Sequence, residues 1–378
     1  MIRRIIIIIL LFILTMLLER AHPLELCCIP LDRFPLLRSE KELEDAQREL
    51  IARTEGKTNA FPDFSTLELL AAGRNFAPRF YGGDDRNDLG DVGVMDPYLQ
   101  ANLDATVLIV DSTIVKQSED DKRWTVDAKP LHELDVCKCE RFSEQRSTAA
   151  GFPCTGFLIT KHLVLTASHC VPRRSALVGR RFVFGFYRRR NADAPTEFAE
   201  NDVQIADRIV FRSSIPCEDL AIVLLKEDIA HSTVRRSTKP VKQGTDVYEI
   251  GYPIGLPAKY APGANVRHAD TTKLFFVANT DGYDGNSGSP VFNAATHEAE
   301  GVHVRGETSL AMPCGCWTST WCPNIGCSGE EFTWITRLPP LYQLPTPVPD
   351  DHVKCPDSPP SAPSRFFQWA YQKYAGGY

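Results

Sequence analysis

Two short apolar runs with a polar turn between them make up the segment CTGFLITKHLVLTASHC, residues 154–170. The runs, 157–160 and 162–166, have strand length and are too short for helices, so they predict a pair of strands that turn back on each other. Similar runs, rich in β-branched and aromatic residues and separated by turn residues, recur from Ala105 onward without a helical period. This spacing predicts an all-β sandwich or barrel.

The second run of the segment leads directly to a histidine. His169 stands beside Cys170, and Cys154 lies 16 residues upstream of Cys170. A returning strand pair can be joined by a disulfide between these cysteines, which would fix the loop that carries the imidazole. An isolated histidine is more often a hydrogen-bonded core residue, but this local context favours a functional one.

A carboxylate stands at the mouth of another apolar run, EDLAIVLL, residues 218–225. A carboxylate in that position is costly unless it is hydrogen-bonded, and an imidazole N–H is a suitable partner. The carboxylate would also fix the tautomer that leaves the other ring nitrogen able to accept a proton. The strand direction favours Asp219 for this role over its neighbour Glu218.

The segment GNSGSP, residues 285–290, places Ser287 in a glycine-rich turn after a strand. A serine hydroxyl becomes a nucleophile when a base lies beside it and N–H donors point at the developing oxyanion. Flanking glycines allow backbone N–H groups to point inward. Because a bare Gly-x-Ser-Gly occurs in many loops, this motif alone is weak evidence for a nucleophile. The prediction depends on the three segments together.

In the chain order His, Asp, Ser, these segments resemble the three catalytic segments of chymotrypsin-like (trypsin-fold) serine peptidases, and the Cys154–Cys170 spacing resembles the disulfide beside that family's catalytic histidine. Three further stretches resemble the bacterial-type, V8-like branch: GNSGSPVFN at 285–293, DDR at 84–86 and GYPIGLPAKY at 251–260. The resemblance covers about residues 84–338.

The resemblance implies an all-β fold of two six-stranded antiparallel β-barrels with the active site in the cleft between them. It implies that His169 is the general base and acid, that Asp219 orients it, and that Ser287 is the nucleophile. The backbone N–H groups of Gly285 and Ser287 would form the oxyanion hole. The first barrel would supply His169 and Asp219, and the second would supply Ser287.

Two opposite expectations concern the substrate-binding residues. The resemblance places Asp281, six residues before Ser287, at the base of the specificity pocket, where trypsin-type enzymes pair an Asp with a substrate Lys or Arg. It also aligns His303 with the histidine that glutamate-specific V8-like enzymes use to receive an acidic side chain, and Arg305 nearby would strengthen that reading. Of the two, we favour the basic preference.

The composition narrows the classes of partner. The 378 residues include 42 Lys+Arg and 48 Asp+Glu, so the net charge is -6 and offers no attraction to nucleic acid. Ordinary apolar and charged fractions exclude a disordered, collagen-like or coiled-coil chain. We expect a monomer that acts on protein or peptide substrates without a cofactor.

The first residues indicate an exported protein. Arg3 and Arg4 precede an apolar run that ends at Leu18, which predicts a secretory signal peptide, with an uncleaved anchor as the alternative. We expect a secreted protein with no membrane contact after signal removal. The expected organisation is a signal peptide at 1–21, a helical leader or propeptide at 22–99, a trypsin-like serine protease domain at 100–338, a Pro-rich linker at 339–363 and an aromatic C-terminal tail at 364–378.

Two of these expectations rest on the C-terminal composition. Nine of the 25 residues at 339–363 are proline, which predicts a stiff, exposed linker. The aromatic side chains of the tail are expected to dock on the body as a terminal helix, because exposed clusters of this kind are rare.

The remaining cysteines leave alternatives open. Four of them, Cys314, Cys316, Cys322 and Cys327, lie within 14 residues, a spacing that suits either a zinc site or disulfides. In an exported chain we favour disulfides and no metal. Cys137 and Cys139 have members of this group or Cys217 as open partners.

The leading functional hypothesis is a secreted serine endopeptidase that forms an acyl-enzyme on Ser287. The alternative is a catalytically inactive serine-protease homologue that acts as a binding module through its cleft or its aromatic tail. An esterase with a nucleophile elbow is disfavoured, because Gly-x-Ser-x-Gly is absent at Ser287 and the order of the triad is His, Asp, Ser.

Overall fold

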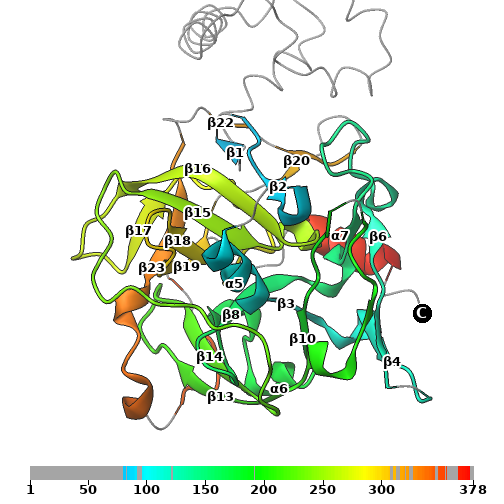
Figure 1. Cartoon of the computed structure of the whole chain (residues 1–378), viewed down its shortest axis with the longest axis horizontal. Coiled ribbons are helices and arrows are strands. Elements are labelled where there is room, and N and C mark those ends of the chain that lie inside the picture. Colours follow the sequence, from blue (N-terminus) through cyan, green and yellow to red (C-terminus); the bar gives the residue numbers. More distant parts are fainter. Residues whose placement is uncertain are drawn as a thin grey trace, which may run out of the picture.

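The computed structural model describes residues 80–374 except 82, 92–95, 121, 191, 307–309, 312–315, 320, 323–326, 345–347, 354 and 356–364. The expected signal peptide, and the leader as far as residue 79, lie outside this part. Two antiparallel sheets, one above the other in Figure 1, form the body of the protein. The expected all-β fold is confirmed.

The first sheet has seven strands in the order β12-β10-β3-β8-β9-β14-β13, all paired antiparallel. Its strands are β3 Thr106–Asp111, β8 Cys154–Leu158, β9 Leu163–Ala167, β10 Arg180–Phe184, β12 Val203–Gln204, β13 Ala206–Arg212 and β14 Leu220–Leu225. Within the described residues no ladder joins its two edges, and the edge strand β12 has only two residues. This body is therefore a curled half-barrel and not a closed six-stranded barrel.

The second sheet closes into a six-stranded barrel. Its order is β15-β18-β19-β23-β17-β16, and a β15–β16 ladder completes the circle, with β2 added outside β16. Its strands are β15 Asp246–Gly251, β16 Lys259–His268, β17 Phe275–Ala278, β18 Pro290–Asn293, β19 Ala299–Arg305, β23 Glu330–Trp334 and β2 Asn87–Asp88.

Short elements complete the described part. The helices are α5 Pro97–Ala105, α6 Arg174–Leu177 and α7 Arg365–Tyr374. The small sheets contain β4 Val115–Gln117, β5 Trp124–Val126 and β11 Glu197–Phe198; β6 Lys129–Pro130 and β7 Arg146–Ser147; β20 Leu310–Ala311 and β21 Thr318–Ser319; and β1 Phe80–Tyr81 and β22 Trp321–Cys322. Helix α5 bridges the two bodies, because Asn102 donates to the hydroxyl of Tyr248 in β15 at 3.0 Å.

The strands around the site are apolar without alternation because both of their faces are covered. Every residue of β9 is buried, as is every residue of β14 except the half-buried Leu224. One apolar cluster runs from these strands to Tyr248, Phe292 and Val302 of the second barrel. The two bodies therefore share a core.

Both ends of the described chain are attached to the body. Strand β1 pairs parallel with β22, and helix α7 buries Phe366, Phe367 and Ala370 in a cluster with Trp317 and other apolar side chains. The expectation that the aromatic tail docks as a helix is confirmed; α7 is the red helix in Figure 1.

The Pro-rich segment is not an exposed linker where it is described. Leu341, Leu344 and Val348 are partly buried against the core of the first sheet, and Cys355 is bonded to Cys217. Apolar side chains lie between the prolines and allow the segment to pack against the core. The number of prolines alone did not predict this packing.

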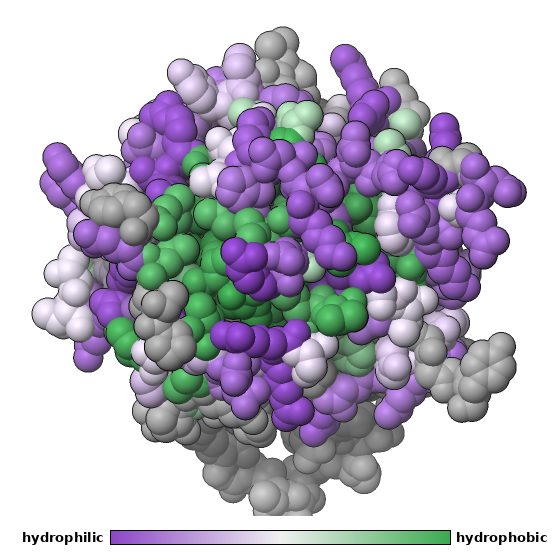
Figure 2. Space-filling model, turned by 90° about the horizontal axis from the view of Figure 1, so that it is seen from below, coloured by the Kyte–Doolittle hydropathy of each residue, from purple (hydrophilic) through white to green (hydrophobic). Residues whose placement is uncertain are grey.

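The surface is mixed. Seen from below, apolar side chains gather at the centre of one face and hydrophilic side chains surround them (Figure 2). Within the described part, no helix has both the length and the apolar character needed to cross a membrane.

Candidate active site

The register of two neighbouring strands brings His169 and Asp219 together. Strand β9 runs antiparallel to β14, with Ala167 opposite Leu220. His169, two residues after the end of β9, and Asp219, directly before the start of β14, must therefore lie at the same end of this strand pair. The amide of Ser168 closes this junction by donating to the carbonyl of Asp219 at 2.9 Å.

Both oxygens of the Asp219 carboxylate hold His169. Nδ1 of His169 lies 2.6 Å from Oδ2, and the backbone N–H of His169 donates to Oδ1 at 2.9 Å. Asp219 is buried and His169 is about one-quarter exposed. Although burial acts to raise the pKa of Asp219, the charge and hydrogen bonds of His169 hold that pKa below its usual range. An ionised Asp219 fixes the proton on Nδ1 and leaves Nε2 to accept one.

The turn that carries Ser287 requires its glycines. Gly285 and Gly288 have φ of +102° and +89°. A Cβ on Gly288 would lie 2.0 Å from the carbonyl oxygen of Thr155, and one on Gly285 would lie 2.5 Å from that of Tyr252. Left-handed backbone with no space for a side chain admits only glycine at both positions.

Thr155 of β8 anchors this turn to the first sheet. Its amide donates to the carbonyl of Ser287 at 2.8 Å, and its hydroxyl donates to the carbonyl of Gly285 at 2.8 Å. The sulfur of Cys170, the residue after His169, lies 3.5 Å from the same Ser287 carbonyl. The nucleophile turn and the His169 loop are therefore in direct contact.

The hydroxyl of Ser287 belongs to a half-buried side chain, and among the described residues no hydrogen bond joins it to His169. Such bonds are often long before a substrate binds. In the same part of the chain the backbone N–H groups of Gly285 and Ser287 have no protein acceptor, which leaves both able to donate to an oxyanion.

The Cys154–Cys170 disulfide is present, with its Cα atoms 6.0 Å apart. The sulfurs lie within 4.8 Å of a His169 ring nitrogen, but both are consumed by the disulfide and are unsuited to hold a metal ion. The bond instead fixes the loop behind the imidazole.

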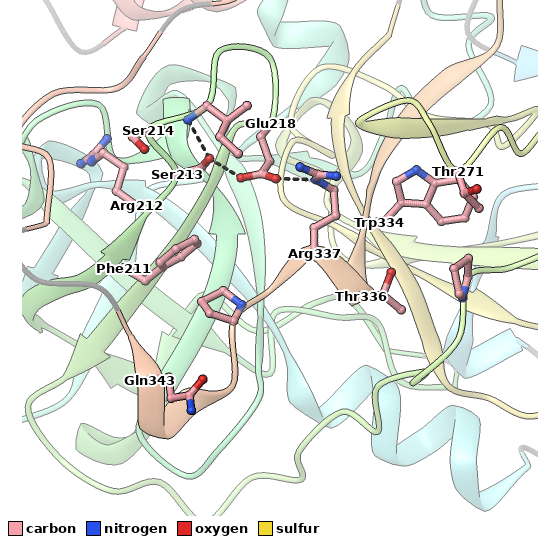
Figure 3. Close-up of a pocket in the computed structure, with 13 residues that line it drawn as sticks. Phe211, Arg212, Ser213, Ser214, Glu218, Thr271, Trp334, Thr336, Arg337 and Gln343 are labelled. Carbon is pink, nitrogen blue, oxygen red and sulfur yellow. Dashed lines mark hydrogen bonds and ion pairs between the residues drawn. The ribbon is translucent and has the colours of Figure 1, made fainter.

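Glu218, the rival of Asp219, faces a different pocket. Its carboxylate is bound by Nε of Arg337 and by the hydroxyl of Ser213, as the dashed lines in Figure 3 show. This pocket of about 610 Å³ is lined by Phe211 from the first sheet and Trp334 from the second. Glu218 is thereby committed to an inter-barrel ion pair, and Asp219 alone of the two holds His169.

Asp281 is placed away from the role expected for it. Its buried carboxylate accepts the amide hydrogens of Tyr81 at 2.7 Å and Asp85 at 3.0 Å. Burial, and next the neighbouring carboxylate of Asp85, raise its pKa well above the usual value. A buried carboxylate that accepts two backbone amides of residues near the start of the described chain is engaged within the protein and is not presented to a substrate.

His303 and Arg305 are also engaged within the protein. His303 is buried, with Nδ1 2.9 Å from Glu249 and Nε2 3.0 Å from Glu330. Burial acts to lower the pKa of His303, but the two neighbouring carboxylates have the larger effect and raise that pKa to about 9. Arg305 donates from Nε to the Glu331 carboxylate at 2.6 Å and from Nη1 to the carbonyl of Cys217 at 2.8 Å. Neither side chain offers an uncommitted charge to an acidic substrate.

Two residues of the site were not predicted from the sequence. Arg212 is buried behind the His169 loop, donating to the hydroxyl of Ser168 at 2.9 Å and to the carbonyl of Val171 at 2.6 Å. His352 reaches Asp219 from the C-terminal segment, with Nδ1 3.4 Å from Oδ1. No motif marks either residue, since both are distant in sequence from the residues they contact.

The other described cysteines favour disulfides over zinc. Cys137 pairs with Cys316, and Cys217 pairs with Cys355 and not with Cys137 or Cys139. Cys139 and Cys327 are also in disulfides. Cys314 and the side chain of Cys322 lie outside what the structure describes.

Comparison with known proteins agrees with this geometry. Residues 154–302, which include His169, Asp219 and Ser287, match the family described as trypsin-like peptidase domain. This stretch, less than half of the 378 residues, is therefore similar to a trypsin-like peptidase domain. No curated protein matches the sequence.

The chain is also similar to solved structures at low identity. Rv3671c from M. tuberculosis H37Rv, a mutant in its inactive form, has 16% identity and a TM-score of 0.36, over 64% of this chain and 86% of that chain. The active form of the Rv3671c protease from M. tuberculosis has 16% identity and a TM-score of 0.35, over 63% and 78%. Deg5 has 13% identity and a TM-score of 0.35, over 63% and 87%. These scores are low, and the site assignment rests on its own contacts.

Proposed function

We propose that the protein is a secreted serine endopeptidase that acts through an acyl-enzyme on Ser287. The observation that carries the proposal is the buried Asp219 carboxylate bound to His169 at 2.6 Å, beside the turn that presents Ser287. The apolar N-terminal run and the disulfides support export, because disulfides persist in oxidising compartments.

In the proposed reaction, Nε2 of His169 takes the hydroxyl proton as Ser287 Oγ attacks the peptide carbonyl. The N–H groups of Gly285 and Ser287 donate to the oxyanion of the tetrahedral intermediate. His169 then gives its proton to the leaving amine, and an ester to Ser287 remains. Water, deprotonated by His169, attacks this ester, and His169 returns the proton to Ser287 Oγ as the ester bond breaks and the acid is released.

The expected preference for a basic substrate residue loses its support at Asp281, and the acidic alternative loses its support at His303 and Arg305, since each of these side chains is bound within the protein. We therefore assign the substrate class as protein or peptide and leave the side chain before the cut unassigned.

Ser287→Ala should lower peptide hydrolysis by about 10³-fold or more, because no other group replaces the nucleophile. Casein hydrolysis and covalent labelling by a fluorophosphonate reagent measure this loss, with circular dichroism to show that the variant is folded. Ser289→Ala is the matched control: Ser289 is buried two residues away and its hydroxyl has no hydrogen-bond partner within the described chain. Wild-type protein that is folded, unlabelled and inactive would favour the binding-module alternative.

A further inference from the structure

The C-terminal segment passes over the junction that holds the catalytic pair. We call residues 348–353 and Cys355 the strap. Its amide at His352 donates to the carbonyl of Pro172 at 2.9 Å, and Arg174 donates to the carbonyl of Val348 at 3.0 Å. Cys355 is bonded to Cys217. The strap is thus attached just after His169 on one side and just before Asp219 on the other.

The strap places one side chain on the catalytic carboxylate. The His352 side chain is 10% exposed, and its Nδ1 lies 3.4 Å from Oδ1 of Asp219. Its ring stands edge-on to that of His169, with the ring centroids 6.3 Å apart. Two imidazoles therefore contact one carboxylate: His169 through Oδ2 and His352 through Oδ1.

A buried carboxylate needs this kind of support. Asp219 is 6% exposed and has a left-handed φ of +54°, a conformation that non-glycine residues rarely adopt. Nδ1 of His352 faces Oδ1 at 3.4 Å as an ion-pair contact outside hydrogen-bond geometry, and the same oxygen accepts the His169 amide. Rotation of the carboxylate away from His169 would break the contact with His352 as well.

The charges around this contact do not offer a substitute for it. Arg212 uses its guanidinium on Ser168 and Val171, behind the loop. Arg173 and Asp351 face each other at 3.8 Å on the solvent side, where each is three-quarters exposed. His169 and His352 are the residues whose side chains lie on the Asp219 carboxylate within the described part of the chain.

We propose that His352 is a positioning residue for the triad: it holds the Asp219 carboxylate in the orientation that His169 requires, and the strap is therefore part of the active site. This inference rests on the proposed peptidase function. It gives His352 no step of its own, because the proton still passes between Ser287, His169 and the leaving group.

The test compares variants of the full-length, disulfide-bonded chain. His352→Ala removes the contact, and His352→Asn keeps a short donor near the position of Nδ1. Asp350→Ala is the matched control, since it removes an exposed ion pair of the same strap, with Arg174, and touches neither His169 nor Asp219. The measurements are the rate of labelling by a fluorophosphonate, and kcat and KM on a fluorogenic peptide selected with the wild type.

We expect His352→Ala to lower kcat and the labelling rate about tenfold with KM nearly unchanged, because a charge-assisted contact that orients the triad is lost. His352→Asn should recover most of this loss, and Asp350→Ala should match the wild type. Equal rates for His352→Ala and wild type, no recovery in His352→Asn, or an equal loss in Asp350→Ala would each overturn the inference. If His352→Ala does not fold, His352→Leu fills the space without a donor.

A second readout separates this inference from the proposed function. The proton between His169 Nδ1 and Asp219 Oδ2 should give a strongly downfield proton NMR signal without any substrate. It should shift or broaden in His352→Ala and stay in His352→Asn. If the wild type shows this signal but Ser287 is not labelled, the proposed peptidase function is refuted, and the signal in the variants still tests the positioning role. An unchanged signal in His352→Ala would refute the positioning role.

Discussion

Adjacent carboxylates in this protein differ in function because their partners differ. Asp219 is bound by His169, while Glu218 is bound by Arg337 and Ser213 in the pocket between the barrels. The sequence favoured Asp219 from the strand direction alone, and that choice agrees with the contacts. The residue type therefore identifies two possible partners for His169, and their positions relative to the start of the strand distinguish them.

The cluster around His303 makes the opposite point, since a residue type that suggests substrate recognition here stabilises the fold. His303 lies between Glu249 and Glu330, all three buried, so a cation is held between two carboxylates. Removal of the cation would leave two buried carboxylates facing each other, which is strongly unfavourable.

This cluster predicts a loss of stability at alkaline pH. The folded pKa of His303 is about 9, above the value of about 6.5 expected in the unfolded chain. The stabilisation is therefore fully present below about pH 6.5 and is lost as pH rises through about 9, a decrease on the order of 3 kcal/mol. Urea unfolding from pH 6 to 10 measures it. A variant with glutamine at 249, 303 and 330 should lack this decrease; an equal decrease in that variant would assign it to other groups.

At the scale of elements, strand ends assemble the site. β9 and β14 bring His169 to Asp219, and Thr155 in β8 holds the Ser287 turn. Apolar runs bounded by turn residues predicted these strands, because both faces of each strand are buried. The three segments that carry His169, Asp219 and Ser287 were also predictable, since each is a short local motif.

What the sequence did not predict depends on contacts between distant segments. Asp281 was expected at the base of a pocket, but its carboxylate accepts the backbone amides of Tyr81 and Asp85. No sequence pattern near Asp281 predicts those two donors. The same holds for Arg212, whose acceptors are carbonyl and hydroxyl groups of the His169 loop.

Two disulfides should separate local order from global stability. Cys154–Cys170 closes a loop of 16 residues beside His169, worth about 3 kcal/mol in the entropic account, whereas Cys137–Cys316 spans 179 residues away from the catalytic pair. Replacing the first pair with serine should slow fluorophosphonate labelling more than it lowers the melting temperature. Replacing the second pair should do the reverse. Equal effects of the two changes on labelling would contradict the local role of Cys154–Cys170.

At the scale of the whole molecule, both extensions beyond the barrels are part of the packed structure. Helix α7 inserts Phe366 and Phe367 into a cluster with Trp317, and the strap rests on the first sheet. The aromatic spacing predicted the docking of α7. The prolines at 339–363 concealed the strap, because composition shows stiffness but not which surface a stiff segment follows.

Removing one aromatic anchor should loosen this attachment. Phe366→Ala should cost about 3–5 kcal/mol of unfolding free energy, because Phe366 is fully buried and its removal leaves a cavity. Gln372→Ala, on the exposed side of the same helix, is the control and should change the free energy little. Urea denaturation compares them; a Phe366→Ala variant as stable as the control would show that α7 contributes nothing to the fold.

The strap follows His169, Asp219 and Ser287 in the sequence, and a protein is synthesised from its N-terminus. A nascent protein carries Ser287, His169 and Asp219 outside the ribosome well before it carries His352, and Cys355 needs an oxidant before it can join Cys217. If His352 positions the triad as proposed, an unfinished or still reduced chain has an incomplete active site. If the protein is also secreted as proposed, the order of translation and the redox state of the compartment would delay full activity until it has left the cell's reducing interior, and this delay would protect the proteins of the cell that makes it.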